Sequence, residues 1–320
     1  MSSASQLNDK QLEAMKYVQG PLLVLAGAGS GKTSVITRKI AYLVQHCGMP
    51  AYRITAMTFT NKAAREMKER VTKLLSREEA KGLSVSTFHN FGLNLLRLEL
   101  KNLPLKANFS ILDADDCKRI LMDLMQRDNL SGAESKELIA KAMRKISEWK
   151  NDLVLPEHVH SICETQEDVQ LAHLYQLYER NLRAYNAVDF DDLIVMPTRL
   201  LQENAEVRDK WQNRVRYLLV DEYQDTNTAQ YTLVKLLVGV MGQFTAVGDD
   251  DQSIYAWRGA KPENMALLKD DFHNLKVIKL EQNYRSTSRI LKAANAVIEN
   301  NPHIFDKKLW SDKGHGDSIR

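Results

Sequence analysis

The segment LAGAGSGKT, residues 25–33, constrains the fold of this chain more than any other stretch. It follows an apolar run at 20–26 and precedes a segment, 33–46, with apolar residues on one helical face: Ile36, Ile40, Leu43 and Val44. Its glycines let successive backbone N–H groups turn toward an anion, and the N-terminus of the following helix favours negative charge. A strand, a glycine-rich loop and a helix in this order predict a phosphate-binding P-loop, with a plain glycine-rich turn as the alternative.

Within this loop we expect Lys32 to reach the β- and γ-phosphates of a nucleotide and Thr33 to hold Mg²⁺ through its hydroxyl. The loop therefore predicts a nucleoside triphosphate with Mg²⁺, and the family resemblance described below implies that the nucleotide is ATP. Alanine stands at the first motif position, where glycine is more common. The predicted nucleotide-binding residues of the loop are Ala26, Gly27, Ala28, Gly29, Ser30, Gly31, Lys32, Thr33 and Ser34.

Apolar runs alternate with amphipathic segments at both ends of the chain. Beyond the P-loop, further strands are expected at 54–59, 84–88, 217–222, 244–249 and 277–282, and a helix at 62–75. Helical stretches such as 117–127 and 134–150 dominate the part between about 90 and 196. The sequence therefore predicts an α/β fold, with a mostly parallel sheet covered by helices on both faces and an inserted helical domain.

The segment RYLLVDEYQDTN, residues 216–227, supplies the carboxylates that a P-loop needs. Asp221 would bind Mg²⁺ directly or through water, and Glu222 would orient and deprotonate an attacking water. Two acids at the end of a buried strand are costly unless a metal or a proton transfer compensates. A solvated loop is the alternative, and it explains Asp225 better than the other two acids.

The loop VGDDDQSIYAWRG, residues 247–259, combines two chemistries. Its acids and Gln252 suit a metal-phosphate site, whereas Tyr255, Trp257 and Arg258 suit a stacked base and a phosphate backbone. We therefore expect its first half to face the nucleotide and its second half to face a nucleic acid.

Composition limits the class of protein without defining the function. The 320 residues are 44% hydrophobic, carry a formal net charge of +3 and contain no apolar stretch long enough for a membrane span. The N-terminus resembles no secretory signal, and the three cysteines are too widely spaced for a disulfide framework or a zinc site. We therefore expect a cytoplasmic protein with no membrane partner.

Several motifs in a fixed order closely resemble the N-terminal half of superfamily-one DNA helicases of the UvrD/PcrA/Rep type. They are LNDKQLEAM (7–15), AGAGSGKT (26–33), TFTNKAAREMKERV (58–71), STFHNFG (86–92), DFDDL (189–193), VDEYQDTN (220–227), VGDDDQSIYAWRGA (247–260) and EQNYRS (281–286). The resemblance implies a RecA-like P-loop NTPase fold. The expected domains are a first motor domain at 1–85 and 197–276, an inserted all-helical domain at 86–196, and the start of a second RecA-like domain at 277–320.

The resemblance also assigns roles in the nucleotide site. Gln11 corresponds to a glutamine that reads adenine, and Tyr284 to a ring that stacks on the base. Arg285 corresponds to a γ-phosphate sensor delivered by the second domain, and Gln252 to a glutamine that senses the γ-phosphate or its water. Ser34 departs from the pattern, because many relatives carry an adenine-stacking arginine there; stacking here would be one-sided or use Arg38.

By the same resemblance, six side chains line a path for single-stranded DNA: Phe59, His89, Phe190, Tyr255, Trp257 and Arg258. The two phenylalanines and Trp257 could instead be core residues, and His89 a structural histidine. Arg258 could bind phosphate or brace its loop through a salt bridge.

The predicted function is an ATP-dependent DNA helicase and 3′→5′ single-strand translocase in replication restart or repair. Its partners would be single-stranded DNA, duplex–single-strand junctions, and replication or repair proteins; the sequence leaves the oligomeric state open. The alternatives are a nucleotide-switched DNA-binding module without unwinding and the motor part of a helicase–nuclease. Because the family's later motifs are absent, we expect a truncated N-terminal part that hydrolyses ATP slowly by itself.

Overall fold

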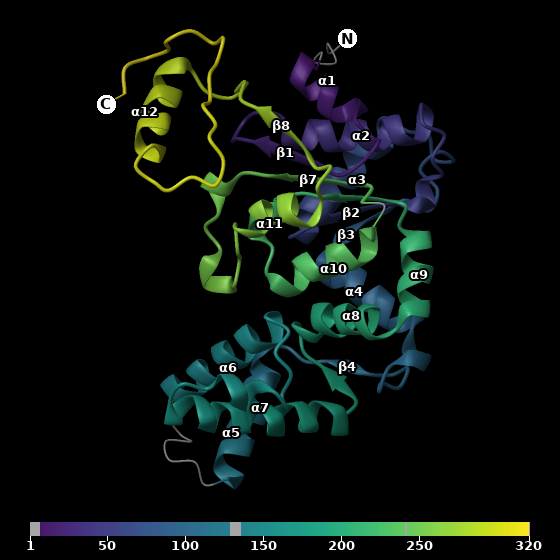
Figure 1. The fold of residues 1–320 in the computed structure, drawn as a ribbon, viewed down its shortest axis with the longest axis vertical. Coiled ribbons are helices and arrows are strands. Elements are labelled where there is room, and N and C mark those ends of the chain that lie inside the picture. The colour runs from purple at the N-terminus through teal and green to yellow at the C-terminus, as the bar shows by residue number, and fades with distance from the viewer. Residues whose placement is uncertain (1–6, 129–135, 241, 320) are drawn as a thin grey trace. The chain divides into compact units, whose positions relative to one another are not determined.

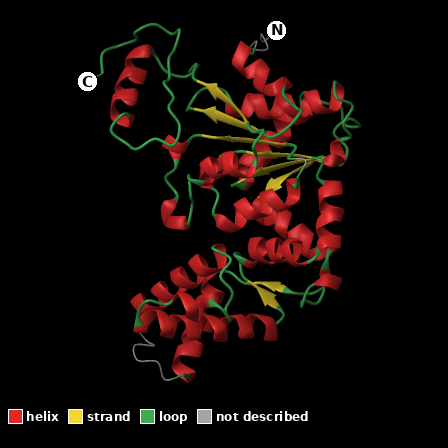
Figure 2. Cartoon of the chain, in the orientation of Figure 1, coloured by secondary structure: helices red, strands yellow, loops and turns green. Residues whose placement is uncertain are grey.

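The computed structural model describes residues 7–128, 136–240 and 242–319. They form two compact units (Figures 1 and 2). The first unit comprises residues 1–87, 210–226 and 237–320, and the second comprises 88–209 and 227–236. No helix among the described residues is long and apolar enough to span a membrane.

A six-stranded sheet forms the centre of the first unit, and every strand pair in it is parallel. The strand order is β3-β2-β6-β7-β1-β8. The strands are β1 (Leu22–Ala26), β2 (Ile54–Thr58), β3 (Ser84–Thr87), β6 (Tyr217–Val220), β7 (Phe244–Gly248) and β8 (Lys276–Leu280). The predicted mixed α/β fold with a parallel sheet is confirmed.

Continuous apolar runs explain the central strands, because every residue of β1, β2, β6 and β7 is buried. The core continues into the helices, where Ile36, Ile40 and Leu43 are fully buried, as their spacing predicted. The helices that begin or lie wholly within this unit are α1 (Asp9–Lys16), α2 (Lys32–Gln45), α3 (Asn61–Thr72), α11 (Asn264–Asp271) and α12 (Ser288–Ile298).

The strand predicted at 277–282 is β8, and it pairs with β1 from Leu22↔Lys276 to Ala26↔Leu280. The apolar run VIKL identified a strand but carried no information about which sheet the strand would join. In the structure β8 is an edge strand of the first sheet.

Helices dominate the second unit, as the sequence predicted. They are α4 (Phe88–Leu98), α5 (Ala114–Arg127), α6 (Lys136–Asn151), α7 (Gln166–Ala184) and α8 (Asp192–Glu203). Two residues at the start of the helix predicted over 134–150 lie outside the described residues. A small parallel sheet joins β4 (Ser110–Ile111) to β5 (Ala187–Val188), and α9 (Ala205–Arg214) and α10 (Thr228–Val238) each contain residues of both units.

Gly92 allows α4 and α8 to approach closely. A Cβ added at this position would collide with the backbone carbonyl of Leu193, which cannot move aside as a flexible side chain can. We therefore expect Gly92→Ala to lower the free energy of unfolding by about 1–3 kcal/mol, despite the better helix propensity of alanine. Urea denaturation measures this change. The control is Asn94→Ala on the exposed side of α4; equal stability of the two variants would contradict the packing argument.

Candidate active site

The P-loop lies between β1 and α2, and two of its glycines have backbone conformations that other residues adopt only with strain. The φ angle is +74° at Gly29 and +88° at Gly31, and Gly31 is the N-cap residue of α2. The loop is closed internally, because the Ser30 hydroxyl donates to the carbonyl of Gly27 at 2.7 Å. The chain enters α2 directly after these turns, so Lys32 and Thr33 lie in the first turn of the helix.

Gln11 packs directly against this loop. Its Nε2 donates to the carbonyl of Ser30 at 2.8 Å, and its Oε1 accepts from the backbone N–H of Asn8 at 3.0 Å. A Cβ at Gly31 would meet the same carboxamide. Each end of the Gln11 carboxamide therefore uses one of its two hydrogen-bonding positions to hold the loop, which leaves a second N–H and a second lone pair for the predicted contact with adenine.

Lys32 connects the P-loop to two of the three other sequence-predicted catalytic residues, Glu222 and Gln252. Its Nζ lies 2.8 Å from Glu222 Oε2 and 3.4 Å from Gln252 Oε1. Glu222 has a φ of +51°, which is uncommon for a residue other than glycine, and it also accepts from Gln224 Nε2 at 2.9 Å. Sequence analysis missed Gln224, which bridges the two acidic loops because its Oε1 accepts from the backbone N–H of Asp249 at 3.0 Å.

Asp221 ends β6 in a buried position. Burial raises its pKa to about 6, with a further contribution from the neighbouring Glu222, whereas Lys32 opposes the shift. The Asp225 carboxyl has a similarly raised pKa, and its Oδ1 is a buried atom without a hydrogen-bond partner. Because Mg²⁺ prefers carboxylate, hydroxyl and water oxygens, the Asp221 carboxylate and the Thr33 hydroxyl have the chemistry of the predicted metal site.

The three acids at 249–251 are held by Lys307, which the sequence gave no reason to select. Its Nζ lies 2.8 Å from Asp249 Oδ1, 2.6 Å from Asp250 Oδ1 and 2.6 Å from Asp251 Oδ2. These contacts raise the lysine pKa above its ordinary value, although burial opposes the rise. The three acids that we expected to suit a metal-phosphate site therefore share one lysine ammonium. Gln252 is the residue of this loop that contacts Lys32.

The segment 281–286 also docks on the P-loop. The Asn283 side chain donates to the carbonyl of Ala28, and the backbone N–H of Tyr284 donates to the carbonyl of Gly29 at 2.9 Å. Sequence analysis included Asn283 in a motif but gave it no role. Arg285 follows β8, and its Cβ lies close enough to the loop to contact a Cβ built at Gly29.

The second half of the 247–259 loop is exposed. Trp257 retains 73% of its accessible surface, so the alternative that it is a core residue is wrong. The Arg258 guanidinium lies 4.5 Å from the Trp257 ring centroid and 5.4 Å from that of Tyr255. Arg258 therefore makes cation–π contacts with both aromatic rings.

The remaining sequence-predicted DNA residues belong to different units. Phe59, at the end of β2 in the first unit, is half-buried. In the second unit Phe190 is 54% exposed, so it is not a core residue, and its ring meets His89 edge-on at 6.3 Å. Burial lowers the pKa of His89.

Within the first unit, Ser34 and Arg38 of α2 are both half-buried.

Residues 7–273 match the family model described as UvrD/REP helicase N-terminal domain. The chain belongs to the UvrD/Rep helicase family. Residues 278–320 of this UvrD/Rep-family chain match the UvrD-like helicase C-terminal domain.

Several curated relatives of this UvrD/Rep-family chain are similar over 98% of its length. It is 56% identical to the ATP-dependent DNA helicase Rep of Escherichia coli (strain K12), covering 46% of that protein. It is 43% identical to the ATP-dependent DNA helicase PcrA of Staphylococcus aureus (strain Mu50), covering 43% of that protein. The chain thus spans about half the length of the curated relatives that it matches.

The raised pKa of Asp221 makes its contribution to stability depend on pH. A carboxyl with a higher pKa in the folded chain holds its proton more tightly there, so its contribution falls as pH rises from 3.8 toward about 6. We therefore expect Asp221→Asn, which cannot ionise, to gain about 1–3 kcal/mol relative to wild type between pH 4 and pH 6.5.

Urea denaturation of the metal-free and nucleotide-free protein at several pH values measures this difference. The control is Asp209→Asn, which removes an exposed carboxylate. A stability difference between Asp221→Asn and wild type that stays constant with pH would contradict the predicted titration.

Proposed function

We propose that this chain is the N-terminal part of an ATP-dependent DNA helicase that moves along single-stranded DNA and acts at duplex–single-strand junctions in replication restart or repair. The contact of Lys32 with both Glu222 and Gln252 supports this proposal most strongly. It joins the phosphate loop, the acidic strand end and the loop that carries Trp257. The names of the Rep and PcrA relatives support the same activity.

The chemistry follows from the positions of these side chains. Bound ATP would place its β- and γ-phosphates at the N-terminus of α2, where Lys32 would exchange Glu222 for phosphate oxygens. Glu222 would then accept a proton from the attacking water, and Arg285 would balance charge that develops on the γ-phosphate. Mg²⁺, held by Thr33 and Asp221, would neutralise the phosphate oxygens.

The 247–259 loop would couple hydrolysis to DNA. Gln252 lies within reach of Lys32, and Trp257 follows five residues later on an exposed turn. An exposed aromatic ring can stack on any base, so the contact would be independent of sequence. Loss of the γ-phosphate would alter the position of Gln252 and thereby the hold of the loop on the strand. We propose movement in the 3′→5′ direction from the family resemblance alone.

A strand-displacement assay on the intact protein tests this function against a nucleotide-switched DNA-binding module. A helicase separates a duplex with a 3′ single-stranded tail when ATP and Mg²⁺ are present, whereas a switch binds the tail without displacing the strand. Displacement accompanied by degradation of the strand would instead indicate the helicase–nuclease alternative.

Replacement of Lys32 tests the phosphate site. We expect Lys32→Ala to reduce DNA-stimulated ATP hydrolysis by at least about a hundredfold, because no other side chain would bridge the β- and γ-phosphates. Steady-state ATPase assays with saturating single-stranded DNA measure the loss. A rate within a few-fold of wild type would contradict the assignment, and an unchanged melting temperature would show that the fold is retained.

The two halves of the 247–259 loop can be tested separately. We expect Trp257→Ala to weaken single-stranded DNA binding by about five- to a hundredfold, the effect of one lost stack, while ATP binding stays near normal. Gln252→Ala should keep DNA binding but lose the response of hydrolysis to DNA. Anisotropy titrations with oligo(dT), nucleotide binding and melting temperature provide the comparison. Parallel loss of ATP affinity and thermal stability in Trp257→Ala would contradict the coupling role.

A further inference from the structure

Three consecutive residues at the carboxyl end of α6, Lys150, Asn151 and Asp152, contact two separate motifs of the second unit. One is DFDDL, which contains Phe190, and the other begins at Asn227 and continues the segment that carries Asp221 and Glu222. None of the three residues has a role in the function proposed above.

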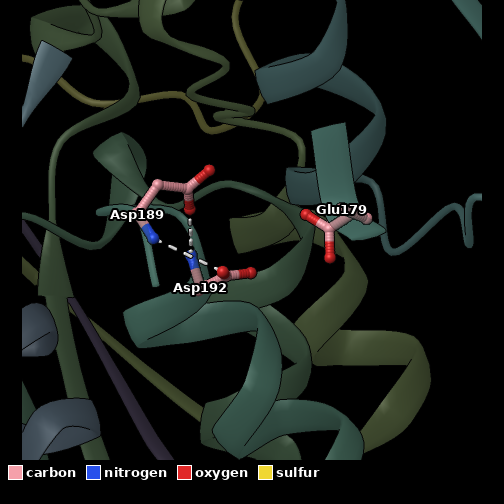
Figure 3. A group of neighbouring side chains, drawn as sticks. All are labelled: Glu179, Asp189 and Asp192. Atoms are coloured by element: carbon pink, nitrogen blue, oxygen red, sulfur yellow. Dashed lines mark hydrogen bonds between the residues drawn. The ribbon is translucent and has the colours of Figure 1, made fainter. Parts of the chain in front are cut away.

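Lys150 fixes the first acid of DFDDL. Its Nζ lies 2.8 Å from Asp189, from Asp192 and from Glu179, and its side chain is only 2% exposed. Figure 3 shows these three carboxylates together, with the hydrogen bonds that join Asp189 to Asp192. The carboxyl oxygens could in principle hold a metal ion, but the ammonium contacts all three groups. The backbone immediately before Phe190 is thereby tied to the end of α6.

Asn151 fixes the residue on the other side of Phe190. Its Nδ2 donates to Asp191 Oδ1 at 2.8 Å, and its Oδ1 accepts from Asn227 Nδ2 at 2.8 Å. Asn227 is itself held at the start of α10, because its Oδ1 accepts from the backbone N–H of Gln230 at 2.9 Å. One carboxamide therefore joins the Phe190 turn to the residue that follows the acidic segment.

Asp152 adds a second link to the same helix start, because its Oδ1 accepts from the Thr228 hydroxyl at 2.8 Å. The end of α6 is itself fixed in an unusual conformation, since Leu153 has a φ of +60° and donates its N–H to the carbonyl of Lys150 at 2.9 Å. Leucine adopts this region only where the surroundings impose it. The helix end is thus a rigid junction rather than a loose connection.

We infer that Asn151, supported by Lys150 and Asp152, is a positioning residue that transmits changes in the 221–227 segment to Phe190. A shift of Glu222 during hydrolysis would pass along the chain to Asn227, through the Asn151 carboxamide to Asp191, and so to the exposed Phe190 ring. This inference rests on the proposed function. It adds a connection to DNA that does not pass through Gln252 and Trp257.

The test uses the intact helicase with Asn151→Ala. The ATPase rate is measured without DNA and with saturating oligo(dT), and oligo(dT) affinity is measured by anisotropy. We expect the DNA-free rate to stay within about twofold of wild type while stimulation by DNA falls about tenfold, in the range of typical coupling. The matched control is Asn181→Ala, which removes an asparagine of the same unit that donates only to Leu177 O among the contacts described.

Each outcome decides the inference. Stimulation within about twofold of wild type would overturn it, as would equal loss of the DNA-free and stimulated rates, because a purely structural role reduces both. If Asn151→Ala does not fold, Thr228→Val, which removes the hydroxyl bound to Asp152 with little change in shape, is measured in the same way. A smaller DNA response supports the inference and an unchanged one overturns it. A wild-type protein without DNA-stimulated ATPase would instead contradict the proposed function.

Discussion

Parallel pairing of β1, β6 and β7 is the constraint on which the candidate site depends. Parallel strands end at the same edge of a sheet, so the residues after Ala26, Val220 and Gly248 emerge side by side. These residues are the P-loop, the Asp221–Glu222 pair and the 249–252 turn. The strands themselves are buried along their whole length, so their register is fixed by packing and does not depend on the polar loops. The packing of these buried strands therefore determines which charged side chains lie next to one another.

At three places in the structure, the acidic side chains contact one lysine ammonium, and the lysine differs from place to place. Lys32 contacts Glu222, Lys307 contacts the acids at 249–251, and Lys150 contacts three carboxylates in the second unit. Charges that are removed from water require such partners, and removing one partner of a buried pair costs about 3–5 kcal/mol. Under the proposed function Lys32 differs from the other two lysines, because a phosphate would replace its carboxylate partner.

The sequence predicted the scaffold and the catalytic loops because both have local signals. An apolar run marks each central strand, and GKT and DE follow directly in the chain. The partners of Lys307 and Lys150 had no such signal, since they lie between 29 and about 60 residues away in sequence. A lysine in a polar segment or at a helix end also usually faces water. The pairing of β8 with β1 and the contact of Asn283 with the P-loop likewise had no local signal. Each depends on which distant segments pack together, and periodicity does not encode that.

Under the proposed function, the ion pair between Lys32 and Glu222 determines when the site can hydrolyse ATP. Each of the two groups satisfies the other, since Lys32 Nζ lies 2.8 Å from Glu222 Oε2. Under the proposed function an incoming triphosphate takes the lysine, and only then does the Glu222 oxygen become available to a water molecule. Binding of the triphosphate would therefore free the catalytic carboxylate. In such a site Glu222 would become available as a base only when a nucleotide is bound.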